Sequence, residues 1–174
     1  MAVKTLADGH KRVTILAARP ANPEAPTVTE LAAGIDASCR FLKSDFRISA
    51  AASDTIADAE LCSTTNAQAF GAGNYEATFT SFRYFDPANP GKFDPAGDVV
   101  FQALKEKGAT VFIAERETGK EFKEAWAAGD EVSVYELLLD NPTKPSEQGG
   151  YVKRTHVPAV QNAWEYGTVA AAGA

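Results

Sequence analysis

The sequence contains few of the residues that build metal, redox or nucleic-acid sites. Its two cysteines and two histidines, Cys39, Cys62, His10 and His156, show no zinc-binding spacing such as CxxC or HxxxH. Lys and Arg number 17 against 23 Asp and Glu, and this net charge of −6 argues against a groove that binds phosphates. We expect both cysteines to be free thiols, as is usual in a reducing compartment.

Long apolar runs are also missing. No stretch approaches the length that spans a bilayer, and polar residues interrupt the N-terminus too often for a secretion signal. We therefore expect a cytosolic product with no membrane partner. The composition, 45% apolar and 23% charged, predicts one globular domain over residues 1–174.

Catalytic motifs are absent as well. The sequence contains no GxSxG, HExxH, GxxxxGK[ST] or GxGxxG pattern. Its acidic clusters, one at Asp54, Asp58 and Glu60 and another over residues 115–124, lack the spacing of a calcium loop and are typical of a solvated surface. The sequence therefore predicts neither an enzyme nor a cofactor.

The segment 74–86, NYEATFTSFRYFD, is the strongest structural signal that is present. It carries five aromatic residues and almost nothing that favours a helix. Its aromatic side chains fall on both faces at a period of two, which predicts a central strand covered on both sides. Phe79 is assigned to the core.

The first fifty residues predict two strands and a proline-rich connection. Residues 1–30 are expected to hold an N-terminal strand at 11–18 and a proline-rich arm, which ends where Thr27 and Glu30 have the spacing of a helix capping box. Alternation over 35–49 predicts a long strand, either continuous or broken by a bulge, that pairs with 74–86.

One amphipathic helix is predicted after the aromatic strand. Asp94 suits its N-cap, Pro95 its first position and Gly108 its C-terminal cap, while Asp98 near the start suits the helix dipole. Three apolar side chains form a stripe that is assigned to the core: Val100, Phe101 and Leu104.

Further strands are predicted at 109–116, 131–140, 151–157 and 160–169, with Trp126 as a core anchor. The predicted class is α+β and mostly β. We expect an antiparallel β-sandwich or partly open barrel with one flanking α-helix and a long inter-strand loop.

That loop, residues 50–73, is too long for an ordinary hairpin connection. It is dominated by Ala, Ser, Thr, Asp and Gly, which bury too little apolar surface to hold one conformation alone. We interpret it as an assembly loop, mobile in the monomer and ordered by a neighbouring subunit; a plain surface loop is the alternative. The candidate contact residues are Asp54, Ile56, Asp58, Leu61 and Phe70.

The order of several phrases resembles the major tail (tail tube) proteins of siphophages. These phrases are DTIADAELC, NYEATFTSFRYFD, GDVVFQALKEKGATVFIAER, AAGDEVSVYELLLDNP and GGYVKRTHVPA. The resemblance runs from about Thr27 to near the C-terminus. It implies a virion protein of the tail, assembled in the host cytoplasm, whose copies form hexameric rings stacked as a hollow tube for DNA ejection.

The resemblance also implies the partners. They are further copies of the chain, the tape-measure protein, the tail terminator and baseplate or tip proteins, with DNA passing through without specific binding. An acidic subunit fits such a conduit because carboxylates repel the phosphate backbone. The alternatives are another tail or connector component, such as a tail terminator or a contractile-system tube, and a small-ligand-binding β domain.

Overall fold

The computed structural model describes residues 4–58, 60–62, 64, 68–146 and 149–172. Its strands are β1 Lys11–Leu16, β2 Ile35–Asp36, β3 Arg47–Ala51, β4 Thr55–Ile56, β5 Ala69–Phe70, β6 Asn74–Phe82, β7 Thr110–Glu117, β8 Glu131–Leu138, β9 Lys153–His156 and β10 Ala159–Thr168. The helices are α1 Val28–Ala32 and α2 Val99–Leu104. No helix among these residues is long and apolar enough to cross a membrane.

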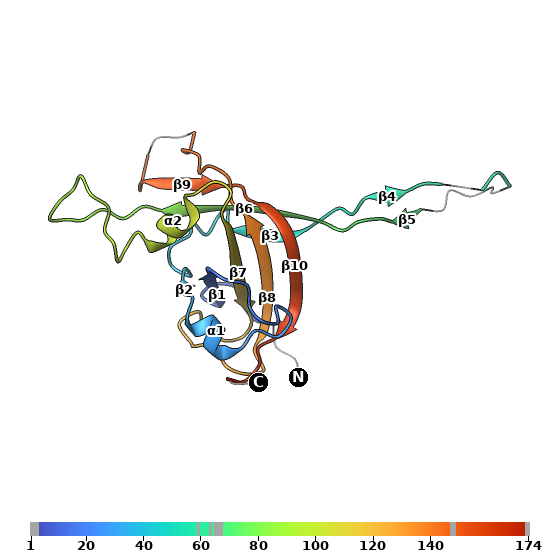
Figure 1. The fold of residues 1–174 in the computed structure, drawn as a ribbon, viewed down its shortest axis with the longest axis horizontal. Helices are drawn as coiled ribbons and strands as arrows, with labels where there is room; N and C mark the ends of the chain where they lie inside the picture. The colour runs from blue at the N-terminus through green and yellow to red at the C-terminus, as the bar shows by residue number, and fades with distance from the viewer. Residues whose placement is uncertain (1–3, 59, 63, 65–67, 147–148, 173–174) are drawn as a thin grey trace.

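Two antiparallel sheets form the body. The large sheet has the order β10-β8-β7-β1-β2, and the small sheet has the order β3-β6-β9. The small sheet runs across one end of the large one, next to α2, while α1 lies toward the other end (Figure 1). The predicted class, mostly β with antiparallel sheets, is confirmed.

The large sheet is buried on both faces along β7. Between the sheets, Ile113 and Leu137 pack with Phe79 and Leu104. On the opposite face, a second apolar cluster gathers Leu16, Leu31, Phe112, Ala114, Trp126, Val132, Val134 and Val169. Six consecutive residues of β7 are therefore buried, a pattern expected of a strand covered on both sides.

The central position of the aromatic strand is confirmed. β6 pairs with β3 through its first half, from Asn74 to Thr78, and with β9 through its second half, from Phe79 to Phe82. The predicted end at Asp86 is wrong, because the strand stops at Phe82. Phe85 then makes only an isolated bridge to Phe93.

The long strand predicted over 35–49 is wrong, although its pairing with the aromatic strand holds through β3. The chain leaves β2 at Asp36, whose Oδ1 accepts hydrogen bonds from the Ser38 backbone N–H at 3.0 Å and hydroxyl at 2.6 Å. This Asx turn redirects the chain from the large sheet to the small one. Phe41 then makes an isolated antiparallel bridge to Ser81 of β6, and a turn over residues 43–45 separates this bridge from β3. Phe41 and Phe46 both pack on the core.

The predicted helix is shorter than expected at both ends. It begins after Asp98 instead of Asp94, because residues 95–98 form a turn, and it ends at Leu104. Gly108 has a φ of +83°, as expected of a C-terminal glycine, but it lies beyond the last helical turn. The capping box at α1 is confirmed: Thr27 Oγ1 accepts from the Glu30 N–H at 3.2 Å, and Glu30 Oε2 accepts from the Thr27 N–H at 2.8 Å.

Candidate functional site

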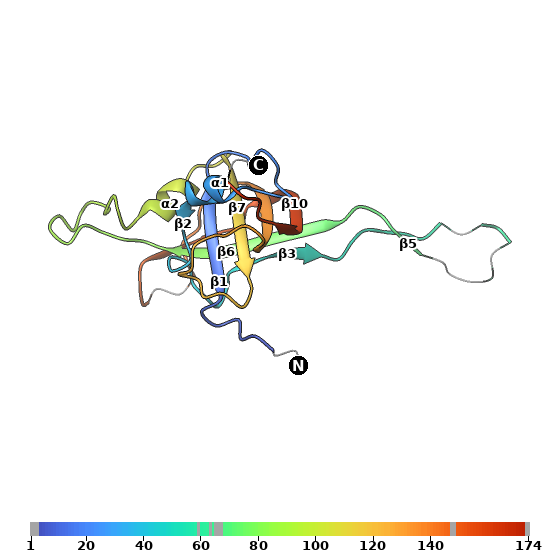
Figure 2. The ribbon, with the colours of Figure 1, turned by 90° about the horizontal axis from the view of Figure 1, so that it is seen from below.

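The expected loop is a hairpin arm, residues 52–73, that projects from the body as an extension of β3 and β6 (Figures 1 and 2). Its branches pair through β4 and β5, with Thr55 opposite Phe70. At its root, the Asn74 amide donates to the Ala52 carbonyl and to Asp54 Oδ1, both at 3.0 Å. The predicted loop therefore has strand pairing of its own, and residues 59, 63 and 65–67 lie outside the described part.

The apolar side chains of the hairpin arm have little to pack against in one copy. Leu61 is fully exposed at 107%, Phe70 is 83% exposed and Ile56 is 51% exposed. Asp54 and Asp58 are also exposed. All five contact candidates chosen from the sequence thus lie on one projecting element, available to another molecule.

A second projection, residues 83–98, leaves the body on the side opposite the hairpin arm (Figures 1 and 2). Its two ends are tied by Asp98, whose side chain is fully buried and accepts from Arg83 Nε at 3.0 Å and the Tyr84 N–H at 2.9 Å. Burial alone would raise the pKa of Asp98, but these bonds and one from Gln102 hold it below its ordinary value. From the sequence, Asp98 was expected to interact with the helix dipole, and its pairing with Arg83 was not predicted.

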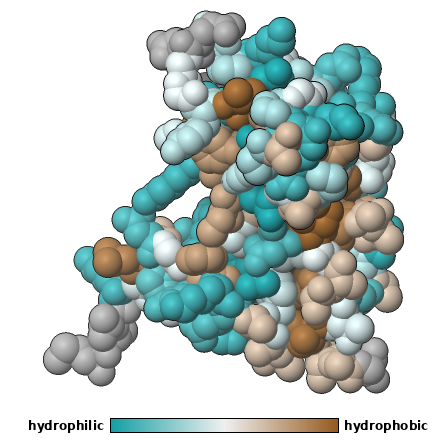
Figure 3. Space-filling model, turned by 90° about the vertical axis from the view of Figure 1, so that its left-hand side faces the viewer, coloured by the Kyte–Doolittle hydropathy of each residue, from teal (hydrophilic) through white to brown (hydrophobic). Residues whose placement is uncertain are grey.

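Aromatic side chains gather where this second projection begins. The rings of Phe82 and Tyr151 meet edge to face, with centroids 5.9 Å apart. An open hollow of about 420 Å³ is lined by Cys39, Phe82, Arg83, Tyr84, Phe85 and Tyr151. Figure 3 shows this side of the molecule, where apolar residues lie among polar ones around a hollow in the surface.

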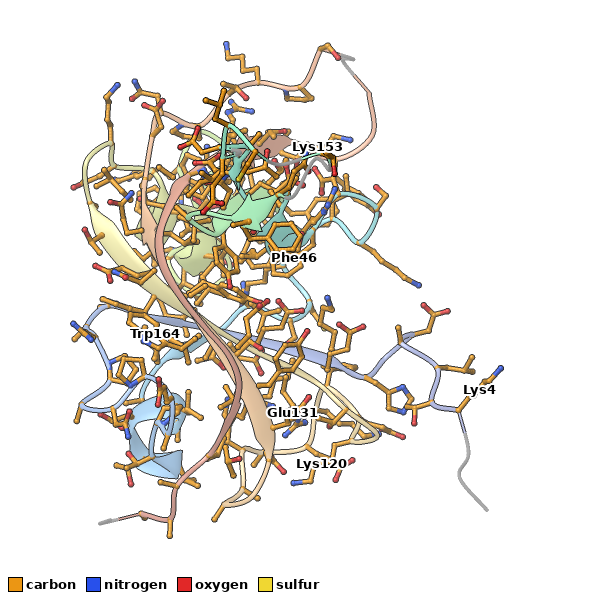
Figure 4. The ribbon with its side chains drawn as sticks, turned by 90° about the vertical axis from the view of Figure 1, so that its right-hand side faces the viewer. Lys4, Phe46, Lys120, Glu131, Lys153 and Trp164 are labelled. Atoms are coloured by element: carbon orange, nitrogen blue, oxygen red, sulfur yellow. The ribbon has the colours of Figure 1, made fainter. Side chains whose placement is uncertain are left out.

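An acidic hollow of about 430 Å³ lies on the side of the hairpin arm, with Phe46 and Glu131 on its lining (Figure 4). Inside it, Lys11 Nζ lies 2.5 Å from Glu115 Oε1, and the Tyr135 hydroxyl donates to Glu165 Oε1 at 3.0 Å. Burial raises the pKa of Glu115 despite the nearby Lys11 ammonium. Among the described residues, no group of three His, Cys, Asp or Glu side chains is placed to hold a metal ion.

A serine and a histidine that sequence reasoning did not bring together meet inside the core. Ser81 Oγ lies 2.9 Å from His156 Nε2, and the two residues are 0% and 2% exposed. Burial lowers the pKa of His156 to about 4. Because β6 and β9 place this pair between apolar neighbours and away from solvent, its role in the structure is packing and hydrogen bonding.

The five side chains assigned to the core, Phe79, Val100, Phe101, Leu104 and Trp126, are all buried. Trp126 Nε1 also donates to Thr14 Oγ1 at 3.0 Å. Beside it lies a buried cation that the sequence gave no sign of: Arg116 is 0% exposed and donates to Asp130 Oδ2 at 3.0 Å. This pair fixes the turn before β8.

The sheets have open edges. β10 and β2 border the large sheet, and β3 and β9 border the small one, where Thr143 bridges to Thr155 on the outer side of β9. Register shifts interrupt β10 between Val160 and Asn162 and again between Trp164 and Gly167, and Tyr166 there has a φ of 58°. Bulges of this kind bend an edge strand and limit where another strand can pair with it.

Comparison with known proteins identifies the family. A family model described as phage tail tube protein matches residues 1–173, including the N-terminal thirty residues that carry none of the resembling phrases. No curated protein matches the chain. Because the family match spans almost the whole sequence, the chain belongs to the phage tail tube protein family.

Proposed function

We propose that this structural tail protein forms hexameric rings that stack into the hollow tail tube, and that the hairpin arm makes the contacts between copies. The observation that carries the proposal is the exposure of Ile56, Leu61 and Phe70 on one projecting element. An apolar side chain gains roughly 1.5–3 kcal/mol on full burial. Repeated around a ring, such contacts favour stacking even where one contact is weak.

The open sheet edges support ring closure. A strand edge with unpaired backbone groups is a template for adding a neighbour, and a head-to-tail contact that closes by rotation gives a ring. β10 offers the longest edge, with the regular stretch Asn162 to Trp164 between its two bulges. We propose that copies join through these edges, so that ring formation covers them.

The charge of the chain supports a conduit for DNA. With a net charge of −6, a ring of such subunits presents excess carboxylate, which repels the phosphate backbone and keeps DNA from adhering. In this proposal the genome passes through the lumen to the host without specific binding. Assembly takes place in the host cytoplasm, and the tape-measure protein, the tail terminator and baseplate or tip proteins are the other tail partners.

Replacing Ser53–Ala69 with a short Gly/Ser linker tests the hairpin arm. We expect a folded monomer with an unchanged circular dichroism spectrum that no longer forms rings or tubes in negative-stain images. The matched control is a variant that keeps the arm and replaces the tip residue Thr64 with Ser, and it should form tubes normally. Normal tubes from the linker variant would overturn the role of the arm.

A further inference from the structure

The surface chemistry of the hairpin arm is both apolar and acidic. Between residues 50 and 73 the sequence has three carboxylates, Asp54, Asp58 and Glu60, and no Lys or Arg. Asp58 and Glu60 are exposed next to Leu61 near the tip. A surface that accepts the arm must therefore combine apolar hollows with positive charge.

One face of the body has this combination. The aromatic hollow that includes Phe82 and Phe85 adjoins a second hollow of about 310 Å³, and Tyr151 lines both. The second hollow is lined by Lys144, Lys153 and Arg154, which form no salt bridge within the described part of the chain. We call the surface formed by Phe82, Phe85, Lys144, Tyr151, Lys153 and Arg154 the aromatic–basic face.

We propose that the hairpin arm of one copy docks on the aromatic–basic face of the next copy in the tube. This inference rests on the proposed function and names the surface that receives the arm. Apolar side chains meet aromatic ones there, with Tyr151 82% exposed and Phe85 42% exposed, and carboxylates meet ammonium and guanidinium groups. Complementary charge of this kind selects the partner and its orientation.

The placement of the two surfaces excludes docking within one copy. The first branch of the arm runs from Ala52 to Leu61, which at about 3.3 Å per residue gives a reach of roughly 30 Å away from the body. The second projection, at whose base the face lies, leaves on the opposite side in both views (Figures 1 and 2). Two different complementary surfaces at opposite ends give a head-to-tail contact, which repeats along an axis and gives the tube a direction.

Two native thiols report on this contact. Cys62 lies near the tip of the hairpin arm, Cys39 lines the aromatic hollow, and both are free and exposed. Treating assembled tubes with a short bismaleimide should join Cys62 of one copy to Cys39 of the next. A denaturing gel of wild-type tubes should then show a ladder of covalent multimers.

Single-cysteine variants test the direction of the contact. We expect Cys39→Ser tubes and Cys62→Ser tubes to give only monomer on the gel, while tubes assembled from a mixture of the two variants give a dimer and nothing larger. A dimer from Cys39→Ser alone would show that arm tips meet each other and would overturn the proposal. Well-formed wild-type tubes without any cross-link would also overturn it.

A charge exchange tests the chemistry without cysteines. Lys144→Glu with Lys153→Glu should lower the amount of sedimenting tube by about tenfold or more, because like charges then face each other. Adding Asp58→Lys and Glu60→Lys to that variant should restore assembly. Failure of the exchange to restore tubes overturns the docking, whereas the absence of any tube or ring from the wild-type protein overturns the proposed function itself.

Discussion

Phe79 and Phe70 belong to one continuous ribbon of chain but have opposite surroundings. Phe79, in the middle of β6, is 0% exposed and packs against Phe41, Phe46 and His156. Phe70, in β5 on the hairpin arm, is 83% exposed. The body therefore satisfies its apolar surface within one copy, while the arm carries apolar surface that the single copy leaves in water.

Removing the ring of Phe79 should have the largest effect. Phe79→Ala opens a cavity where both sheets meet, and we expect the free energy of unfolding to fall by roughly 3–5 kcal/mol. Chemical denaturation followed by tryptophan fluorescence measures this, since Trp126 is buried. A loss as small as that of an exposed residue would mean that the body does not depend on this core.

Removing the buried carboxylate of Asp98, at the base of the second projection, should have the second-largest effect on the free energy of unfolding. Asp98→Ala leaves the Arg83 guanidinium and two further donors without their acceptor, and breaking a buried pair costs roughly 3–5 kcal/mol. Asp58→Ala, which removes an exposed carboxylate from the hairpin arm, is the control and should leave the unfolding curve unchanged. Equal effects from the two variants would erase the distinction between body and arm.

The buried imidazole of His156 should have a smaller effect on the free energy of unfolding, and this effect should depend on pH. Folding lowers the pKa of His156 from 6.5 to about 4. Between pH 4 and pH 6.5, the unfolded chain therefore binds a proton at this residue that the folded chain does not bind. Stability should therefore fall as the pH drops from 6.5 to 4, by up to about 3 kcal/mol from this group.

The His156→Gln variant isolates this contribution. The raised pKa of Glu115 acts in the opposite direction and is present in both proteins, so the difference between the two denaturation profiles reports His156 alone. A difference that stays constant over this pH range would show that the imidazole is not shielded from water.

The smallest effect on folding is expected on the hairpin arm. Phe70→Ser should change the free energy of unfolding of the monomer by no more than about 0.5 kcal/mol, because an exposed ring loses little on truncation. The same variant should form fewer tubes by sedimentation, while Phe70→Leu, which keeps an apolar side chain, should assemble. Destabilisation of the monomer by Phe70→Ser would place this ring in the core.

Elements with strong local signals were predicted from the sequence. The capping box of Thr27 and Glu30, the strand signal over residues 131–140 and the stripe of α2 each depend on neighbours within a few residues. The segment 35–49 was misread because Phe41 bridges Ser81 of β6 through its backbone, whereas Phe46 reaches the core from irregular chain, so the apolar spacing mixes backbone pairing with tertiary packing. Single-sequence periodicity does not distinguish these two origins.

One of the two surfaces in the proposed contact could be recognised from the sequence. The hairpin arm was conspicuous because its composition is too poor in apolar residues for a packed segment of that length. The aromatic–basic face was not, because Phe82 and Tyr151 belong to strands and loops far apart in the chain and meet only through the pairing of β6 with β9. Contacts between distant segments leave no periodic pattern.

The root of the hairpin arm has a mechanical consequence. β6 is the middle strand of the small sheet, bonded to β3 on one side and β9 on the other. It also continues the second branch of the arm, the one that carries β5. A pull along the arm draws β3 and β6 in the same direction and loads the ladder between β6 and β9 in shear, so that its hydrogen bonds resist together instead of peeling apart one by one. We expect the arm to transmit axial tension between neighbouring copies without unravelling the body that bears it.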